Sequence, residues 1–491
     1  MKMIAFHNLG CKVNSYELDL MQQTLQKDGW EIVDFDQKAD VYVINTCSVT
    51  NIADRKSRQM IHRAKTLNPD AVIAAVGCYV QADAFNLAQD NTVDLLVGNN
   101  KKADFHLILK EYLEAKAAGT LEEYANRTIG QNAKDGALEL VGQIENEGPD
   151  ISGTEFEVRN YLIKTLGNTT IVDLKKVPFE KGSITHTDSH TRAYIKIQDG
   201  CNRYCSYCII PYTRGNVRSK PIEEVLEEAR IIVGNGVREL VLTGIHISSY
   251  GVDFKTGTPG EHLLTLLSGL DAIRGLDRIR LSSFEPMLIT EEFAEGLGKI
   301  KKLCPHFHLS LQSGCDETLK RMNRRYTSDE YAEKVKLLRK VFPDAAITTD
   351  IIVGFPQETE KEFKETVQFA EAIGFYEIHV FKYSRRKGTP ADRNPDQVPE
   401  QVKGVRSDTL LELTAAQSKA FRQRRIGKET EVLFEEEKTI DGKPYWVGHT
   451  KEYVLVAVRS LEPLENRIMR VIPQGFLTDE VLLADGVESG L

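Results

Sequence analysis

Three closely spaced cysteines, Cys201, Cys205 and Cys208, are the residues of this sequence best suited to metal chemistry. Four-iron clusters normally take four thiolate ligands, whereas this C-x3-C-x2-C run offers only three. Three thiolates leave one iron open, and an open metal position is typical of catalytic rather than structural sites. The run therefore predicts a 4Fe-4S cluster at which chemistry takes place.

A zinc site of the Cys3His type is the alternative for this run. His186 or His190, upstream of Cys201, is available as the fourth ligand. A zinc ribbon, however, would show a second cysteine pair within about 20 residues, and none follows here. The iron–sulfur interpretation is therefore favoured.

A second set of cysteines lies in the N-terminal part of the chain, which alternates between predicted strands and helices. Apolar runs typical of buried parallel strands occur at residues 3–9, 41–46 and 72–77, and helical periodicity occurs at 15–27 and 52–67. Cys11, Cys47 and Cys78 each come at or just past the end of one of these strands. The carboxyl ends of parallel strands share one crevice, where ligands bind.

Burial is the simplest explanation for any single cysteine, because cysteine is often buried. The same position on three strands is harder to explain in that way. Cys11, Cys47 and Cys78 therefore predict a second cluster held by three thiolates.

The central part of the chain predicts a partial parallel barrel of six β-α units. Its strand-like runs lie at 192–197, 239–242, 278–282, 307–311, 346–352 and 377–381, with helical segments that include 222–233, 261–273 and 360–372. Polar motifs follow the strands, among them Thr243-Gly244, Ser282-Ser283-Phe284-Glu285 and Gln312-Ser313-Gly314. The carboxyl ends of barrel strands are where active sites lie, so these motifs favour a ligand site.

Several motifs carry a family resemblance. The run at 201–208 resembles the signature of radical S-adenosylmethionine (SAM) enzymes, and NLGCKVN (8–14), NTCSVT (45–50) and GCYVQ (77–81) resemble the N-terminal domain of methylthiotransferases. The resemblance covers nearly the whole chain apart from a middle insertion. It implies two 4Fe-4S clusters, each held by three cysteines. One cluster cleaves SAM, and the other supplies or carries the inserted sulfur.

The resemblance also implies roles for individual residues. Cys201, Cys205 and Cys208 would be both metal ligands and catalytic residues, and Cys11, Cys47 and Cys78 would hold the second cluster. SAM would be bound by residues at the barrel strand ends, namely Gly244, Ser283, Glu285 and Gln312. Gly244 would let the backbone approach the SAM amino group closely because glycine has no side chain.

The fold class expected from these patterns is α/β, in four segments. They are a methylthiotransferase domain at 1–110, a linker or insertion at 111–190, a radical SAM domain at 191–427 and a TRAM-like all-β barrel at 428–491. Within the linker, 156–166 and 169–174 are predicted as short ordered elements. A long helix is predicted at 401–425, followed by strands at 431–434, 445–448, 453–458 and 468–472.

The end of the predicted long helix is basic. Arg422, Arg424, Arg425 and Lys428 are predicted to contact RNA beside the TRAM-like barrel, although basic residues there also complement the helix dipole. The net charge of −9 argues against nucleic-acid binding over the whole surface, so such contacts must be local.

The composition limits the remaining possibilities. Eight cysteines in 491 residues are too few for a disulfide scaffold, and 41% hydrophobic content is ordinary for a soluble protein. The longest apolar stretch, near 71–76, is far too short to span a membrane, and the first residues lack a signal-peptide pattern. A cytoplasmic location without membrane contact is therefore expected.

The function that the resemblance implies is methylthiolation of a tRNA adenosine next to the anticodon. CKVN (11–14) and QSGC (312–315) resemble the branch that acts on N6-threonylcarbamoyladenosine at position 37; isopentenyl-adenosine and a ribosomal-protein aspartate are the sister substrates. The implied partners are a tRNA anticodon stem-loop and an electron donor such as flavodoxin or ferredoxin. Two other hypotheses stay open: a non-catalytic, metal-stapled RNA-binding protein, and a radical enzyme that has lost sulfur insertion.

Overall fold

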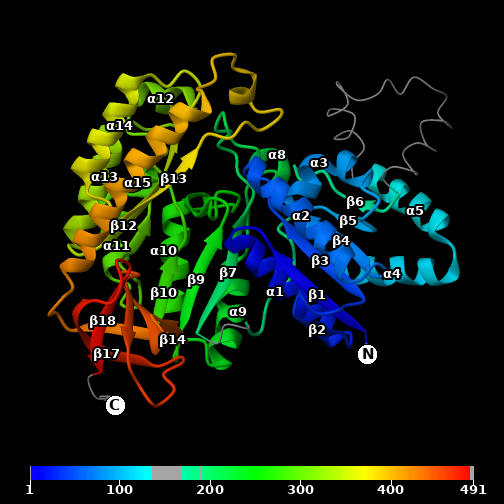
Figure 1. Ribbon diagram of the computed structural model, residues 1–491, viewed down its shortest axis with the longest axis horizontal. Helices are drawn as coiled ribbons and strands as arrows, with labels where there is room; N and C mark the ends of the chain where they lie inside the picture. Colours follow the sequence, from blue (N-terminus) through cyan, green and yellow to red (C-terminus); the bar gives the residue numbers. More distant parts are fainter. Residues whose placement is uncertain (1, 135–166, 176, 188–190, 487–491) are drawn as a thin grey trace. The chain divides into compact units, whose positions relative to one another are not determined.

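A computed structural model describes residues 2–134, 167–175, 177–187 and 191–486 (Figure 1). The chain forms two compact units. Unit 1 comprises Met1–Ile184, Asp199–Arg218 and Ser384–Thr389, and unit 2 comprises Thr185–Gln198, Ser219–Tyr383 and Pro390–Leu491. The loop that contains Cys201 thus belongs to the same unit as the N-terminal cysteines. The element predicted at 156–166 lies outside the described residues.

Unit 1 is built on a parallel sheet with the strand order β2-β1-β3-β4-β5-β6. Its strands are β1 (Met3–Asn8), β2 (Glu31–Val33), β3 (Val41–Thr46), β4 (Val72–Gly77), β5 (Leu95–Val97) and β6 (Thr169–Thr170). Every residue of β3 and β4 is buried, as expected for parallel strands covered on both faces. The predictions of β1, β3 and β4 are confirmed, whereas β2, β5 and β6 have no counterpart among the predicted strands.

Helices cover both faces of this sheet. Those of unit 1 are α1 (Lys12–Lys27), α2 (Asn51–Leu67), α3 (Cys78–Ala88), α4 (Phe105–Ala118) and α5 (Leu121–Lys134). Side chains of α1 and α4 pack with Val41 and Val43 on one face. Side chains of α2 and α3 pack with Tyr42 and Ile44 on the other. The two faces of β3 therefore contribute to two separate cores, as the pleat requires.

Unit 2 contains the predicted partial barrel. Its strands are β7 (Arg192–Asp199), β8 (Arg218–Ser219), β9 (Glu239–Gly244), β10 (Arg278–Leu281), β11 (His306–His308), β12 (Ala346–Val353) and β13 (Glu377–Lys382). They form two sheets, β10-β9-β7-β8 and β11-β12-β13, and the isolated parallel bridge Phe284–Leu309 joins the segments after β10 and β11. All six predicted barrel strands are present, with β11 shorter than predicted.

The barrel helices follow the predicted alternation. They are α9 (Ile222–Gly234), α10 (Pro259–Asp271), α11 (Glu291–Gly298), α12 (Asp316–Arg321), α13 (Ser328–Val341), α14 (Glu360–Ile373) and the long α15 (Glu400–Gln423). Reciprocal capping boxes start α10, α13 and α14 at Thr258, Thr327 and Thr359. Within the described residues, no helix has the length and apolar character needed to cross a membrane.

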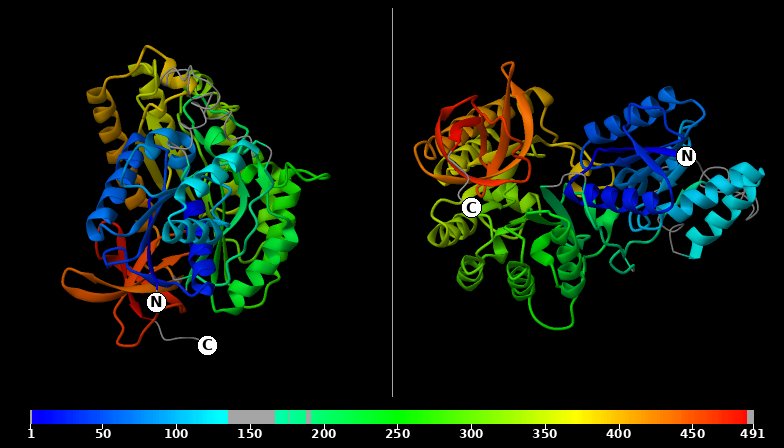
Figure 2. Two further views of the ribbon diagram at one scale, coloured as in Figure 1. Left: turned by 90° about the vertical axis from the view of Figure 1, so that its right-hand side faces the viewer. Right: turned by 90° about the horizontal axis from the view of Figure 1, so that it is seen from below.

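The C-terminal segment forms a closed barrel of five strands, drawn in orange and red in Figure 2. Its strands are β14 (Thr430–Ile440), β15 (Lys443–Thr450), β16 (Leu455–Val458), β17 (Ile468–Phe476) and β18 (Val481–Gly486). Four of them were predicted. The fifth, β18, closes the barrel by pairing with both β16 and β17, and the all-β character predicted for this segment is confirmed.

Buried ion pairs join this small barrel to the strands of the partial barrel within unit 2. Glu239 on β9 accepts hydrogen bonds from Arg192 (2.7 Å) and Arg280 (2.9 Å). Burial alone would raise the pKa of Glu239, but the surrounding arginines lower it well below its usual range. Arg192 also pairs with Glu435 on β14 at 2.8 Å. The attachment of the small barrel therefore depends on charge as well as on apolar packing.

Candidate functional site

The three N-terminal cysteines lie at the carboxyl ends of adjacent strands. Cys11 is the N-cap residue of α1 after β1, Cys47 follows β3 directly, and Cys78 opens α3 after β4. Because β1, β3 and β4 are neighbours in the parallel sheet, their ends meet at one edge. Cys78 and Cys11 both lie near enough to Cys47 to raise the pKa of its thiol. The structure therefore brings together the three residues that the sequence pattern singled out.

The protonation chemistry of this group fits a metal cluster. Burial raises the pKa of the Cys47 thiol to about 12, and the neighbouring Cys78 and Cys11 add to the shift. At neutral pH such a thiol keeps its proton unless a cation replaces it, and metal binding supplies that cation. Asn99 donates a hydrogen bond to the Cys78 sulfur at 3.4 Å, which is an interaction that would also stabilise a bound thiolate.

The second group of cysteines lies in the loop that follows β7. The Cys201 amide donates to the Gly215 carbonyl at 2.9 Å, and the Cys208 amide donates to the Cys205 carbonyl at 2.9 Å. Gly200 has φ +71°, and a Cβ there would lie 1.9 Å from the Asn216 carbonyl oxygen. No other residue fits at this position without moving the loop. The backbone therefore holds the three cysteines in a tight, defined turn.

The two histidines considered as a fourth zinc ligand both precede the Cys201–Cys208 loop. His186 contacts Thr185 at 3.0 Å, and His190 lies outside the described residues. The zinc alternative therefore stays a prediction, and metal analysis of the protein tests it.

A fully buried arginine joins the two cysteine groups within unit 1. Arg214 is the last residue of the short helix α8 (Ile210–Arg214), which follows the Cys201–Cys208 loop. It donates to Glu17 (2.8 Å) and Asn14 (2.8 Å) on α1 and pairs with Asp199 at 3.1 Å. Asn14 lies three residues after Cys11, and Asp199 lies two residues before Cys201. Burial alone would lower the pKa of Arg214, but Cys78, Glu17 and Asp199 raise it well above its ordinary value.

A buried lysine extends this network to β3, the strand that Cys47 follows. Lys102 donates to Glu17 at 2.5 Å and to the side chain of Asn45 at 3.0 Å, and Asn45 lies two residues before Cys47. Arg214, Lys102 and Glu17 have side chains that are at most 1% exposed. No motif or spacing in the sequence indicated these residues, since their contacts join segments up to 200 residues apart.

The predicted SAM-binding residues lie at strand ends of the partial barrel in unit 2. Gly244 ends β9, and a Cβ there would lie 2.9 Å from the side-chain oxygen of Gln198, so a larger residue would have to displace that side chain. Glu285 is buried and pairs with Arg324 at 3.1 Å and with His246 at 3.2 Å. Its carboxylate is thus held in place by two basic side chains, which were not predicted.

The other two predicted SAM contacts differ in burial. Gln312 is buried, with φ +74°, an uncommon backbone conformation for a residue other than glycine. Its amide donates to the Asp350 carbonyl at 2.8 Å. Ser283 is half-buried after β10. Backbone outliers of this kind gather at ligand sites, so the conformation of Gln312 supports a binding role at this edge of the barrel.

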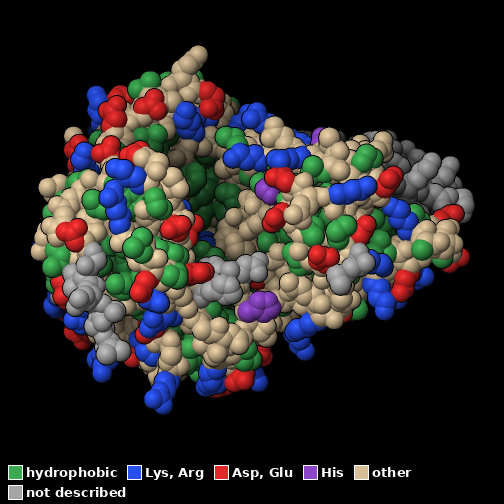
Figure 3. All heavy atoms as spheres, turned by 60° about the horizontal axis from the view of Figure 1, so that its bottom comes forward, with side chains coloured by type: hydrophobic (Ala, Val, Ile, Leu, Met, Phe, Trp, Pro, Cys, Tyr) green, Lys and Arg blue, Asp and Glu red, His purple; other side chains and the backbone are tan. Residues whose placement is uncertain are grey.

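The four basic residues proposed for RNA contact fall into two groups. Arg425 donates to the Asp344 carbonyl at 2.9 Å and pairs with Glu452 at 3.5 Å, and Arg422 donates to the Asp479 carbonyl at 2.8 Å. These two therefore tie the end of α15 to other parts of unit 2. Arg424, whose guanidinium lies 4.8 Å from the Phe421 ring centroid, and Lys428 are exposed. On the face shown in Figure 3, basic and acidic side chains are interspersed.

Comparisons with known proteins agree with this architecture. Residues 195–370 match the radical SAM superfamily, and residues 3–98 match a family described as "Uncharacterized protein family UPF0004". The solved structure of TsrM, a radical SAM methyltransferase from Kitasatospora setae with cobalamin and an iron–sulfur cluster bound, has a TM-score of 0.52 at 16% identity. That match covers 80% of this chain and 74% of TsrM, and it indicates a shared fold. The fold and the three-cysteine loop define a radical SAM enzyme.

Similar proteins of known function identify the family within the radical SAM enzymes. Threonylcarbamoyladenosine tRNA methylthiotransferase MtaB from Bacillus subtilis is 38% identical over 473 residues, 96% of this chain and 93% of the relative. A tRNA-2-methylthio-N(6)-dimethylallyladenosine synthase from Oceanobacillus iheyensis is 32% identical, covering 96% of this chain and 81% of the relative. The chain belongs to the radical SAM tRNA methylthiotransferase family. The enzymes of this family use SAM and 4Fe-4S clusters, as the sequence motifs implied.

Proposed function

We propose that this enzyme converts N6-threonylcarbamoyladenosine at position 37 of tRNA to its 2-methylthio derivative. The observation that carries the proposal is the 38% identity, over nearly the whole of both chains, to a relative named for that nucleoside. A second such relative, from Aquifex aeolicus, is 37% identical over 437 residues. The presence of two three-cysteine groups in one compact unit supports sulfur insertion in addition to SAM cleavage.

The six cysteines divide the chemistry between them. Cys201, Cys205 and Cys208 would hold the cluster that, when bound, supplies the electron for cleaving SAM, and Cys11, Cys47 and Cys78 would hold the cluster concerned with sulfur. Gly200 and Gly215 allow the tight backbone path around the loop that contains Cys201. Asn99 contacts the Cys78 sulfur at 3.4 Å, and Asn14 contacts the Cys11 sulfur at 3.6 Å. A C–H bond of adenine is too strong for acid–base chemistry, so the reaction needs this radical route.

The partners follow from the reaction. The target base must leave its stack to be modified, and an anticodon loop permits this at low energetic cost. We therefore propose that the enzyme binds the anticodon stem-loop of tRNA. The exposed Arg424 and Lys428 would contact the RNA backbone. Flavodoxin or ferredoxin would deliver the electron, and the cytoplasm would be the location of both partners.

Nucleoside analysis of tRNA tests the substrate. We expect tRNA from cells that lack this protein to contain unmodified N6-threonylcarbamoyladenosine and no 2-methylthio derivative, and expression of the protein should restore the derivative. Liquid chromatography with mass spectrometry of digested tRNA measures both nucleosides. The 2-methylthio derivative of isopentenyl-adenosine should be unchanged and serves as the internal control.

The isopentenyl nucleoside is the second candidate substrate, because several relatives at 31–33% identity are named dimethylallyladenosine synthases. If the protein restored only the isopentenyl product, the threonylcarbamoyl assignment would be wrong and the family assignment would stand. A change in neither nucleoside would contradict tRNA methylthiolation itself.

A further inference from the structure

Two histidines and an aspartate gather on one face of the sheet β11-β12-β13. The parallel register places His308, Thr348 and Glu377 side by side across the three strands, and it places Asp350 beside His379 two residues further along. The opposite face of β12 carries Ile347 and Ile351, both fully buried. On the face with the histidines, the side chains of His308, Asp350 and His379 are 12%, 26% and 44% exposed.

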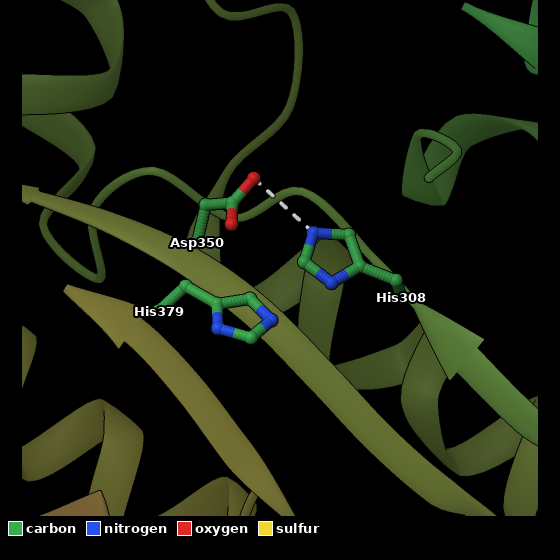
Figure 4. A group of neighbouring side chains, drawn as sticks. All are labelled: His308, Asp350 and His379. Atoms are coloured by element: carbon green, nitrogen blue, oxygen red, sulfur yellow. Dashed lines mark ion pairs between the residues drawn. The ribbon is translucent and has the colours of Figure 1, made fainter. Parts of the chain in front are cut away.

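The three side chains point toward one another in Figure 4. The His308 Nε2 and Asp350 Oδ2 atoms are 3.1 Å apart, and one ligand atom from each of the three residues lies within 4.8 Å of the others. Two ligands of one zinc ion lie less than about 4.2 Å apart, twice the bond length of ~2.1 Å. The His379 side chain is 44% exposed, and its ring stacks on that of His308 with the centroids 5.5 Å apart, so binding of one ion would require the His379 ring to turn.

The outer nitrogen of His308 has an oxygen partner at hydrogen-bond distance, and that of His379 lies near a carboxylate. The Nδ1 atom of His308 lies 3.0 Å from Thr348 Oγ1, and the Nδ1 atom of His379 lies 3.7 Å from Glu377 Oε1. Metal-binding histidines typically have such a partner on the nitrogen that does not bind the metal, because it fixes the ring and its tautomer. Both Nε2 atoms are thereby left for a ligand on the side of Asp350.

The charges of the group favour a cation. Asp350 and Glu377 bring two negative charges to two histidines that are neutral in their metal-binding form. We propose that His308, Asp350 and His379 bind one divalent transition-metal ion such as Zn²⁺. Two imidazoles and one carboxylate suit zinc, iron or cobalt better than magnesium or calcium, which prefer oxygen ligands alone. These three residues belong to unit 2, whereas both cysteine groups belong to unit 1, and the proposal does not depend on the proposed tRNA substrate.

Three protein ligands leave further coordination positions on such an ion. An oxygen donor, such as a carboxylate or a hydroxyl group, can bind at these positions. Gln312 lies directly beside the site, because its amide donates to the Asp350 carbonyl. An ion here would therefore bind its outer ligand next to a predicted SAM contact.

Zinc content tests this site in the anaerobically reconstituted full-length protein. After equilibration with micromolar Zn²⁺ and dialysis, we expect wild type to retain about one zinc per chain in addition to its iron. His308→Gln, Asp350→Asn and His379→Gln should each weaken zinc binding at least about tenfold, since loss of an outer partner alone costs that much. Elemental analysis by mass spectrometry measures zinc and iron in the same sample.

His62→Gln is the matched control. His62 forms a surface pair with Asp90 at 2.8 Å but has no third ligand among the described residues, so its loss should leave the zinc content unchanged. His379→Gln replaces a half-exposed side chain and tests the site without disturbing the fold. Equal zinc in wild type and the three site variants, at equal iron content, would overturn the proposal, as would an equal loss in His62→Gln.

Discussion

Replacement of Cys208 by alanine should abolish SAM cleavage, with the rate falling at least about 1,000-fold, equivalent to more than about 4 kcal/mol. Cys208 is one of three thiols in a loop whose backbone fixes all three, and loss of one leaves too few ligands for a stable catalytic cluster. The measurement is formation of 5′-deoxyadenosine from SAM under reducing, anaerobic conditions. Activity above a few per cent of wild type would contradict the role assigned to this loop.

Replacement of Cys78 by alanine should separate the two halves of the reaction. The variant should still cleave SAM but should form no methylthiolated nucleoside, because Cys78 belongs to the other cysteine group. Cys304→Ala is the control and should keep both activities, since Cys304 is buried in unit 2 whereas both cysteine groups belong to unit 1. Equal behaviour of Cys78→Ala and Cys208→Ala in SAM cleavage would contradict the division of labour. An unchanged product yield would indicate a radical enzyme without sulfur insertion.

Arg214→Met should destabilise unit 1 strongly. The Arg214 side chain is fully buried and donates to Glu17, so its loss leaves buried carboxylates short of a partner. Breaking a buried ion pair by removing one partner costs about 3–5 kcal/mol. For a unit of this size, the calorimetric unfolding midpoint should fall on the order of 10 °C.

Arg230→Met is the control for this variant. Arg230 pairs with Glu227 at 3.1 Å on an exposed helix face, and surface substitutions of this kind change stability by about 0.5 kcal/mol or less. A loss below about 1 kcal/mol in Arg214→Met would show that the buried network does not hold the two cysteine groups together.

The strands whose bounds were predicted correctly from sequence are those that are buried on both faces. β3 and β4 are buried on both faces, so their apolar runs are continuous and bounded by polar residues. β2, β5 and β6 have only two or three residues, too few for any periodicity to be visible. The helix α1 begins at Lys12 rather than at 15, because Cys11 takes the N-cap position.

The candidate site was predictable only where its chemistry lies in local spacing or strand-end position. The cysteines at 201–208 form a local motif, and Cys11, Cys47 and Cys78 share a register that is visible in sequence. Arg214 could not be found in this way, because its partner Glu17 lies in a distant segment. The group of His308, Asp350 and His379 likewise exists only through the pairing of three strands.

The most direct test of the central claim, that one chain holds two three-thiolate clusters, is iron and sulfide content after anaerobic reconstitution. Wild type should bind about eight irons per chain. Alanine at Cys201, Cys205 and Cys208 together, or at Cys11, Cys47 and Cys78 together, should leave about four in either case. Zinc in place of iron, or an iron content that neither triple variant lowers, would contradict the account.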